Sequence, residues 1–198
     1  MPAILSQSFY LNEIVTEIAK ALLGKVLVTN INKILTSGII IETEAYSWIE
    51  RGCHAYQQRK TTRNEPMFDK GGVSYVYLCY GVYELFNVVT NKEGIADAVL
   101  IRALEPRDGL HEMLRRTKVK SPARITSGPG KLTRALGISG KHNRIDLISG
   151  AKVWIEDQGI KYRPSQINSS SRIGLNIKND DARLPWRFTV KGNPWLSQ

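Results

Sequence analysis

Two glutamates, two positions apart, carry the first chemical signal in this chain. The stretch IIIETEAY covers residues 39–46, and the alternation of an extended strand would place Glu42, Glu44 and Tyr46 on one face. A carboxylate pair emerging from an apolar strand is costly unless it is bonded or used. Mutual repulsion and partial burial are expected to raise the pKa of at least one carboxyl, which suits a general base near neutral pH. The alternative is a pair of exposed carboxylates at a sheet edge that make surface ion pairs.

The stretch YVYLCYGVYELFN, residues 75–87, holds four tyrosines and one phenylalanine. Gly81 supplies the positive φ that a hairpin turn needs, so Tyr80 is predicted at the tip. An exposed tyrosine on a protruding turn suits a wedge in a base stack. Tyr77, nearer the sheet, suits a platform under an extruded base. The alternative is that these rings pack in a half-buried sheet, where tyrosine is common.

The remaining polar motifs are weaker signals. His54 lies in a basic loop beside Cys53, but neither HExxH nor HxE…PCxxC is present, so no metal site is predicted. Cys53 and Cys79 are predicted to be free thiols in a reducing compartment. The segment 127–131, SGPGK, lacks the P-loop pattern, yet it would hold a DNA phosphate at a helix N-terminus. Residues 180–181, two aspartates, are predicted to lie in a loop.

The elements that position these residues form a mixed pattern without repeats. A helix is predicted after Asn12, with apolar residues at 3.6-residue spacing up to Gly24. Residues 47–72 lose all periodicity and are predicted to be a long functional loop. The other predicted elements are strands at 25–30, 34–46, 74–80, 82–90, 97–104, 151–156 and 186–191, and helices at 108–117 and 127–137, the latter started by Ser127 and Pro129 and ended by Gly137. Consecutive strands with tight turns favour an antiparallel sheet flanked by helices, an α+β fold.

Length and charge set the broad limits. The chain has 198 residues, enough for a single domain with its own core. Its 28 Lys+Arg against 18 Asp+Glu give a net charge of +10, which attracts polyanions such as nucleic acid. We find no apolar run long enough to span a bilayer and no basic amphipathic helix, so a membrane partner is not expected. The N-terminal residues lack the features of a secretory leader. An intracellular location is therefore expected, in the cytoplasm and nucleoid of a bacterium or the nucleus of a eukaryote.

Seven blocks, taken together, resemble one family. ETEAY, HAYQQRKTTRN, YVYLCYGVYELFNVVT, VLIRALEP, SGPGKL, RIGL and RFTVKGNPW follow one another in the order and approximate spacing of the mammalian-type alkyladenine (3-methyladenine) DNA glycosylases. The resemblance covers residue 8 to the end. It implies a single α+β domain over residues 1–198 with a curved, mainly antiparallel sheet, similar to the C-terminal tRNA-binding domain of formyltransferases. It also implies a monomer that needs no metal or other cofactor.

The resemblance assigns roles to seven residues. Glu44 matches the general base that activates water, and Arg102 matches an arginine that helps to hold the DNA and this water. Tyr46 and Tyr77 match the two walls that stack on the extruded base. The other three matches are His54, which contacts the flipped nucleotide, Asn87, which helps to exclude bases with an N2 amino group, and Tyr80, which intercalates into the duplex.

Cleavage of an N-glycosidic bond fits these residues chemically. Positive charge builds on the sugar, and a carboxylate with an oriented water suits that transition state. Electron-rich aromatic walls attract a cationic alkylated purine. The resemblance implies that alkylated and deaminated purines in double-stranded DNA (3-methyladenine, hypoxanthine, ethenoadenine) are removed after base flipping, as a step of base excision repair. No lysine matches a nucleophile, so the product is expected to be an abasic site. Two rivals remain: a noncatalytic nucleic-acid-binding module, and a metal-dependent nuclease using Glu42, Glu44 and Asp180.

Overall fold

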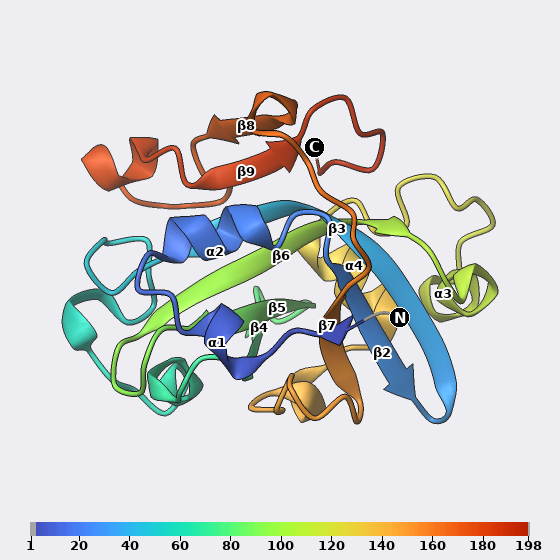
Figure 1. Cartoon of the computed structure of the whole chain (residues 1–198), viewed down its shortest axis with the longest axis horizontal. Coiled ribbons are helices and arrows are strands. Elements are labelled where there is room, and N and C mark those ends of the chain that lie inside the picture. The colour runs from blue at the N-terminus through green and yellow to red at the C-terminus, as the bar shows by residue number, and fades with distance from the viewer. Residues whose placement is uncertain (1–2, 198) are drawn as a thin grey trace.

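A curved sheet forms the centre of the computed structural model, which describes residues 3–197 (Figure 1). Within these residues the sheet has nine strands, and all their pairings are antiparallel. The strand order is β1-β7-β2-β3-β6-β5-β4, and β9 pairs with both β3 and β8. The strands are β1 (Ala3–Ile4), β2 (Val26–Ile31), β3 (Ile34–Tyr46), β4 (Ser74–Cys79), β5 (Tyr83–Thr90), β6 (Asp97–Pro106), β7 (Val153–Asp157), β8 (Ile167–Ser170) and β9 (Arg187–Val190). The predicted antiparallel sheet is confirmed; the likeness to formyltransferase domains stays a prediction.

Short helices cover the sheet on both faces. In Figure 1, α2 crosses the near face over β3 and β6, whereas α4 lies behind the sheet. The α-helices are α1 (Gln7–Tyr10), α2 (Val15–Ala21), α3 (Leu110–Thr117) and α4 (Pro129–Leu136), and the 3-10 helices are η1 (Tyr56–Gln58), η2 (Glu65–Phe68), η3 (Gly140–His142), η4 (Pro164–Gln166) and η5 (Asp180–Arg183). Among the described helices, none combines the length and the apolar character needed to cross a membrane.

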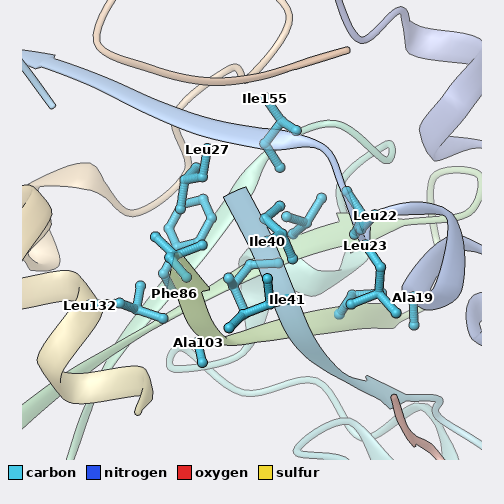
Figure 2. Close-up of a cluster of buried hydrophobic side chains, with 14 of the residues drawn as sticks. Ala19, Leu22, Leu23, Leu27, Ile40, Ile41, Phe86, Ala103, Leu132 and Ile155 are labelled. Carbon is cyan, nitrogen blue, oxygen red and sulfur yellow. The ribbon is translucent and has the colours of Figure 1, made fainter. Parts of the chain in front are cut away.

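The main hydrophobic core extends through the sheet at β3. Ile40 and Ile41 are both fully buried, between side chains of α2 such as Ala19 and, on the other side, Leu132 of α4 (Figure 2). Burying one such aliphatic side chain contributes about 1.5–3 kcal/mol. The core therefore packs against both faces of β3, the strand that carries Glu42 and Glu44.

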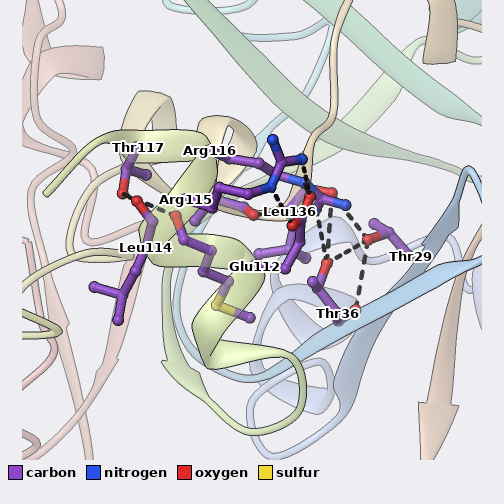
Figure 3. A network of polar contacts seen from close by, with 10 residues as sticks. Thr29, Thr36, Glu112, Leu114, Arg115, Arg116, Thr117 and Leu136 are labelled. Carbon is purple, nitrogen blue, oxygen red and sulfur yellow. Dashed lines mark hydrogen bonds and ion pairs between the residues drawn. The ribbon is translucent and has the colours of Figure 1, made fainter.

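A polar network fixes the C-terminal end of α4 to the sheet (Figure 3). Thr29 and Thr36, buried on β2 and β3, share a 2.7 Å hydroxyl hydrogen bond, and Thr29 also donates to the carbonyl of Leu136 at 2.9 Å. Arg116 of α3 donates to Thr36 Oγ1 and to the carbonyl of Ala135, both at 3.2 Å. These bonds satisfy buried polar groups that would otherwise be costly. With one end anchored, the N-terminus of α4 is held at a defined place beside β5.

Strand β3 is covered along both of its edges. Residues 34–39 pair with β2, residues 42–44 pair with β9 on the same side, and β6 covers the opposite side. The register with β6 shifts twice around Glu42, where Ile41 and Arg102 have no partner across the ladder; the two shifts cancel, so the pairs on either side keep one register. Thr43 donates to the carbonyl of Ala19 in α2 at 2.8 Å, so alternation turns Glu42 and Glu44 to the other face. The alternative of exposed sheet-edge carboxylates is therefore wrong.

The long segment 47–72 is ordered by its own small core. It contains η1 and η2, and its buried Cys53, Ala55 and Met67 pack with Tyr75 of β4 in a second hydrophobic cluster. Asn64 donates to the carbonyl of His54 at 2.8 Å and to that of Arg59 at 2.9 Å. The absence of sequence periodicity thus corresponds to a compact loop. Its packing places His54 beside Tyr75 and Tyr77 of β4.

Most predicted elements lie within two residues of their observed bounds. The helix predicted after Asn12 begins at Val15, and Asn12 Oδ1 accepts a 2.9 Å bond from the amide of Ile14. Helix α4 begins at Pro129 and ends before Gly137, whose φ is 76°. The short elements α1, β1 and β8 and the 3-10 helices η1 to η4 were not predicted, and residues 180–183 form a 3-10 helix, not a plain loop. Elements this short carry too few residues for a periodic signal.

Candidate active site

A cavity of about 720 Å³ opens between the β4–β5 hairpin, segment 47–72 and the N-terminus of α4. Six of the seven predicted site residues line it: Tyr46, His54, Tyr77, Tyr80, Asn87 and Arg102. Glu44 does not line the cavity, because its side chain is fully covered by the residues that do. The structure therefore brings the predicted residues together around one space, with the carboxylate beneath its floor.

The floor is organised around Glu44. Its Oε1 accepts a 2.7 Å bond from the amide of Ile173, and its Oε2 accepts a 2.7 Å bond from the hydroxyl of Tyr46. The Nη1 of Arg102 lies 3.3 Å from Oε1. Burial, and next the negative charge of Glu44, raise the pKa of Tyr46 well above its ordinary value, so the phenol stays protonated and donates. Three donors from three parts of the chain thus fix this carboxylate.

Glu42 lies beside Glu44 in a different environment. Its Oε1 accepts from Arg102 Nε at 2.9 Å, Arg187 Nε at 2.8 Å and Ser197 Oγ at 2.6 Å. Its Oε2 accepts from the amide of Ser197 at 2.8 Å. Burial opposes ionisation, but the bonds from Ser197 and the two arginines outweigh it and lower the pKa of Glu42. The expected rise is therefore wrong for Glu42, because cationic and hydrogen-bond donors, not the neighbouring carboxylate, dominate its surroundings.

Tyr77 and Tyr46 are the two tyrosines predicted as walls, and each has a guanidinium close to its ring. The Cζ of Arg63 lies 4.9 Å from the Tyr77 ring centroid. The Cζ of Arg172 lies 4.7 Å from the Tyr46 centroid. Such cation–π contacts contribute about 0.5–2 kcal/mol each, more when they are desolvated. Each ring is thus held in place by a neighbouring guanidinium.

His54 stands beside the Tyr77 wall. Its ring centroid is 4.7 Å from that of Tyr77, and its Nδ1 lies 2.9 Å from the hydroxyl of Tyr75. Burial of the ring on this side, and next the charge of Arg63, lower the pKa of His54 to about 4, although other atoms of the residue face solvent. The imidazole is therefore neutral at pH 7, able to accept at one nitrogen and to donate at the other.

Asn87 is fixed within the cavity wall. It is buried on β5, opposite Tyr75 in the ladder, and its side-chain amide donates to the carbonyl of Tyr75 at 3.0 Å. This bond holds the amide plane in one orientation. The discrimination of bases by their edge substituents, which the resemblance implies for Asn87, stays a prediction.

The hairpin between β4 and β5 ends in an exposed apolar tip. Tyr80 has φ 51° and Gly81 has φ 70°, and the amide of Val82 donates to the carbonyl of Cys79 at 3.1 Å. Tyr80 is 86% exposed and Val82 is 70% exposed. The predicted position of Tyr80 at the tip is confirmed. Cys53 and Cys79 are free, as predicted.

The N-terminus of α4 forms another side of the cavity. Gly128, Pro129, Gly130 and Lys131 all line it. A Cβ on Gly130 would lie 2.6 Å from Tyr83 Cδ1, so only glycine allows this close packing against the hairpin. The Oγ of Ser127 is buried without a hydrogen-bond partner among the described residues. Helix amides and a lysine beside the cavity form an electropositive edge, which is where the sequence predicted a phosphate contact.

Several residues of the site were missed by reasoning from the sequence. The amide of Ile173 bonds Glu44, and Arg172 next to it forms a buried ion pair with Glu50 at 2.6 Å. Ser197 lines the cavity and bonds Glu42. The blocks RIGL and RFTVKGNPW contain or adjoin these residues and were noted only as parts of a resemblance. A signal was therefore present, but it did not specify a role.

The residues proposed for the rival nuclease do not gather. Asp180 forms an exposed ion pair with Arg183, and Glu42 is occupied by arginines. Among residues 3–197, no group of three histidines, cysteines, aspartates or glutamates could hold a metal ion.

Comparisons with known proteins agree with this geometry. A family model described as methylpurine-DNA glycosylase (MPG) matches residues 8–194. A protein of Chlamydia felis named "Putative 3-methyladenine DNA glycosylase" is 44% identical over 189 residues, covering 94% of this chain and 95% of its own length. One of the same name from Clostridium tetani is 40% identical over 194 residues, covering 92% and 93%.

The cavity and its carboxylate thus lie in a protein that hydrolyses N-glycosyl bonds, a DNA glycosylase. More narrowly, the chain belongs to the methylpurine-DNA glycosylase family, so the resemblance that the seven blocks indicated is confirmed.

Proposed function

We propose that this chain is a monofunctional, monomeric DNA glycosylase whose residues 1–198 act as one catalytic domain in base excision repair. It flips a damaged purine out of duplex DNA into the cavity and leaves an abasic site. Its substrates are 3-methyladenine, hypoxanthine and ethenoadenine. The observation that carries the proposal is the buried Glu44 beneath a tyrosine-lined cavity, with Arg102 3.3 Å away.

The roles follow from where the side chains lie. Tyr80 enters the duplex and fills the gap, and the base stacks between Tyr46 and Tyr77, where stacking is worth about 1–3 kcal/mol per base. Unstacking the base from the duplex costs a few kcal/mol. Insertion of Tyr80 and stacking on Tyr46 and Tyr77 together offset this cost. His54 and Asn87 contact the nucleotide and restrict which base edges fit. Lys131 and the amides of α4 hold a backbone phosphate.

Glu44 is the general base that takes a proton from water as the bond to the sugar breaks. Its negative charge also stabilises the positive charge that develops on the sugar. Because Glu44 is fully covered in the free protein, entry of the base must displace Tyr46 or Arg102 slightly to admit one water. A cationic alkylated purine leaves readily, whereas a neutral lesion needs a proton during departure.

An excision assay tests the proposal. Duplex DNA with one hypoxanthine or one ethenoadenine is incubated with the protein and EDTA. Release of free base with an intact backbone is the expected result. Binding without release would leave only a noncatalytic module, and strand cutting abolished by EDTA would indicate a metal-dependent nuclease.

A further inference from the structure

The two glutamates of β3 compete for the same arginine. Arg102 reaches Glu42 through Nε at 2.9 Å and Glu44 through Nη1 at 3.3 Å. A short charge-assisted bond measures about 2.7–2.9 Å, so the contact with Glu44 is the looser one. The guanidinium is planar and rigid, and a bond at Nε therefore sets the direction of the whole group.

Glu42 has little capacity left for a ligand. Four donors occupy its two oxygens, three of them at Oε1. Glu44, by contrast, accepts one hydrogen bond at each oxygen besides the looser contact with Arg102. A carboxylate offers about four acceptor positions, so the four donors use the capacity of Glu42, whereas Glu44 keeps one acceptor position for a water that enters when its covering side chains shift.

Ser197 joins this group to the rest of the fold. Its amide and hydroxyl both donate to Glu42, and its Oγ lies 3.4 Å from Arg102 Nη2. The preceding residues are anchored, since Asn193 donates to Glu105 at 2.8 Å and Trp195 packs against the main core. Ser197 is therefore anchored through contacts other than that with Arg102.

We propose that Glu42 is a positioning residue, which rests on the proposed function of Glu44. Glu42, held by Arg187 and Ser197, keeps Arg102 directed at the cavity and prevents it from closing onto Glu44. Without Glu42, Arg102 would pair closely with Glu44 and occupy the positions that the water needs. The remaining charged and titratable groups near Glu44 are Tyr46 on its own strand, Arg172 and Tyr77. None of these three replaces the anion that Glu42 supplies.

The variant Glu42→Gln tests this role, because it keeps the shape and removes the charge. We expect single-turnover excision of hypoxanthine at pH 7 to fall about 10- to 100-fold, the scale of a small misplacement in an active site. Affinity for the lesion duplex should stay unchanged. The acidic limb of the rate profile should move to lower pH, because one negative neighbour is lost and Arg102 draws nearer to Glu44. A merely structural role would not move that limb.

The matched control is Glu105→Gln, because Glu105 lies on β6 like Arg102 but, among the described residues, bonds neither Arg102 nor Glu44, and the glutamine oxygen can still accept from Asn193. This control should keep the wild-type rate and profile. Thermal unfolding followed by circular dichroism establishes that each variant is folded.

Each outcome decides the inference. If wild type excises the base, Glu44→Gln does not, and folded Glu42→Gln keeps both rate and profile, the positioning role is wrong while the proposed function stands. If wild type excises nothing, the proposed function itself fails. Should Glu42→Gln not fold, Ser197→Ala takes its place, and slower excision at unchanged affinity is expected. An unchanged rate in Ser197→Ala would then overturn the inference.

Discussion

The floor of the cavity and the tip of the β4–β5 hairpin are built on opposite principles. At the floor, Glu42, Glu44 and Arg102 are all buried, and each is bonded to groups from distant parts of the chain. At the tip, Tyr80 and Val82 are largely exposed and rest on a turn of a few residues. The floor is charged and closed, whereas the tip is apolar and open.

The difference fits the two tasks that we propose for these regions. Proton transfer needs groups held within a fraction of an ångström, which burial and multiple bonds provide. Insertion into a base stack needs an apolar group that protrudes and finds its partner only on binding. Damage to the floor should therefore appear in the rate or the stability, and damage to the tip should appear in affinity.

The largest effect is expected from Glu44→Gln. The amide keeps the size of the side chain but cannot take a proton, so excision should fall by about 10²–10⁴-fold, the usual contribution of a general base. Affinity for a lesion duplex should persist. Single-turnover excision and a fluorescence anisotropy titration measure the two quantities. A rate near that of wild type would refute the role as base.

Next in size is the loss of stability in Arg172→Ala. The Arg172 and Glu50 side chains are 0% and 2% exposed, and two bonds of 2.6 and 2.7 Å join them. Removing one partner of a buried pair leaves an uncompensated charge, which lowers the free energy of unfolding by about 3–5 kcal/mol. Urea unfolding measures this change.

Arg183→Ala is the control for that variant, because Arg183 pairs with Asp180 at the surface. Its unfolding free energy should stay within about 0.5 kcal/mol of wild type. Equal losses of unfolding free energy in the two variants would mean that burial does not determine how much an ion pair contributes to stability.

A smaller effect, of another kind, is expected from Tyr80→Ala. Loss of the inserted ring should weaken binding to a duplex with an abasic analogue by about 1–3 kcal/mol. The melting temperature should stay the same, since the side chain is exposed. The control is Ile14→Ala, another exposed apolar residue, at the start of α2. Unchanged affinity in Tyr80→Ala would remove the assignment as wedge.

The smallest effect concerns His54, between floor and tip. Its pKa is lowered from 6.5 to about 4 by burial and by Arg63. Between these pH values the unfolded chain binds more protons, so its contribution to stability is complete above pH 6.5 and is lost as the pH falls toward 4. His54→Gln should make the fall in melting temperature across this range less steep. His142 has a pKa lowered in the same direction, so some slope should remain. An identical slope in the variant would contradict the shift.

The tip could be predicted from the sequence because its conformation depends only on residues close to one another in the chain. Gly81 and the alternation of residues 75–79 define a hairpin within a few positions, and Tyr80 follows from them. The common face of Glu42 and Glu44 could be predicted for the same reason, since it depends only on strand periodicity.

The surroundings of the two glutamates could not be predicted from the sequence. Whether β3 is an edge strand depends on β9, and the bond between Glu42 and Arg187 joins residues 145 positions apart. The amide of Ile173 is a donor that almost every residue possesses, so no residue type marks it. Burial of Arg172 depends likewise on Trp186 and Glu50, which only the fold brings to it.

The irregular pairing of β3 with β6 limits which mutations the residues around Glu42 can accept. Ile41 and Arg102 each lack a partner across the ladder. Because each strand has one unpaired residue, the pairs on either side keep one register, and removing Ile41 alone would shift the pairing by one residue and turn one of the acidic side chains away from Arg102. We therefore expect this stretch to accept replacements of its apolar residues and to reject any insertion or deletion, so that its length is as much a part of the proposed catalytic site as its carboxylates.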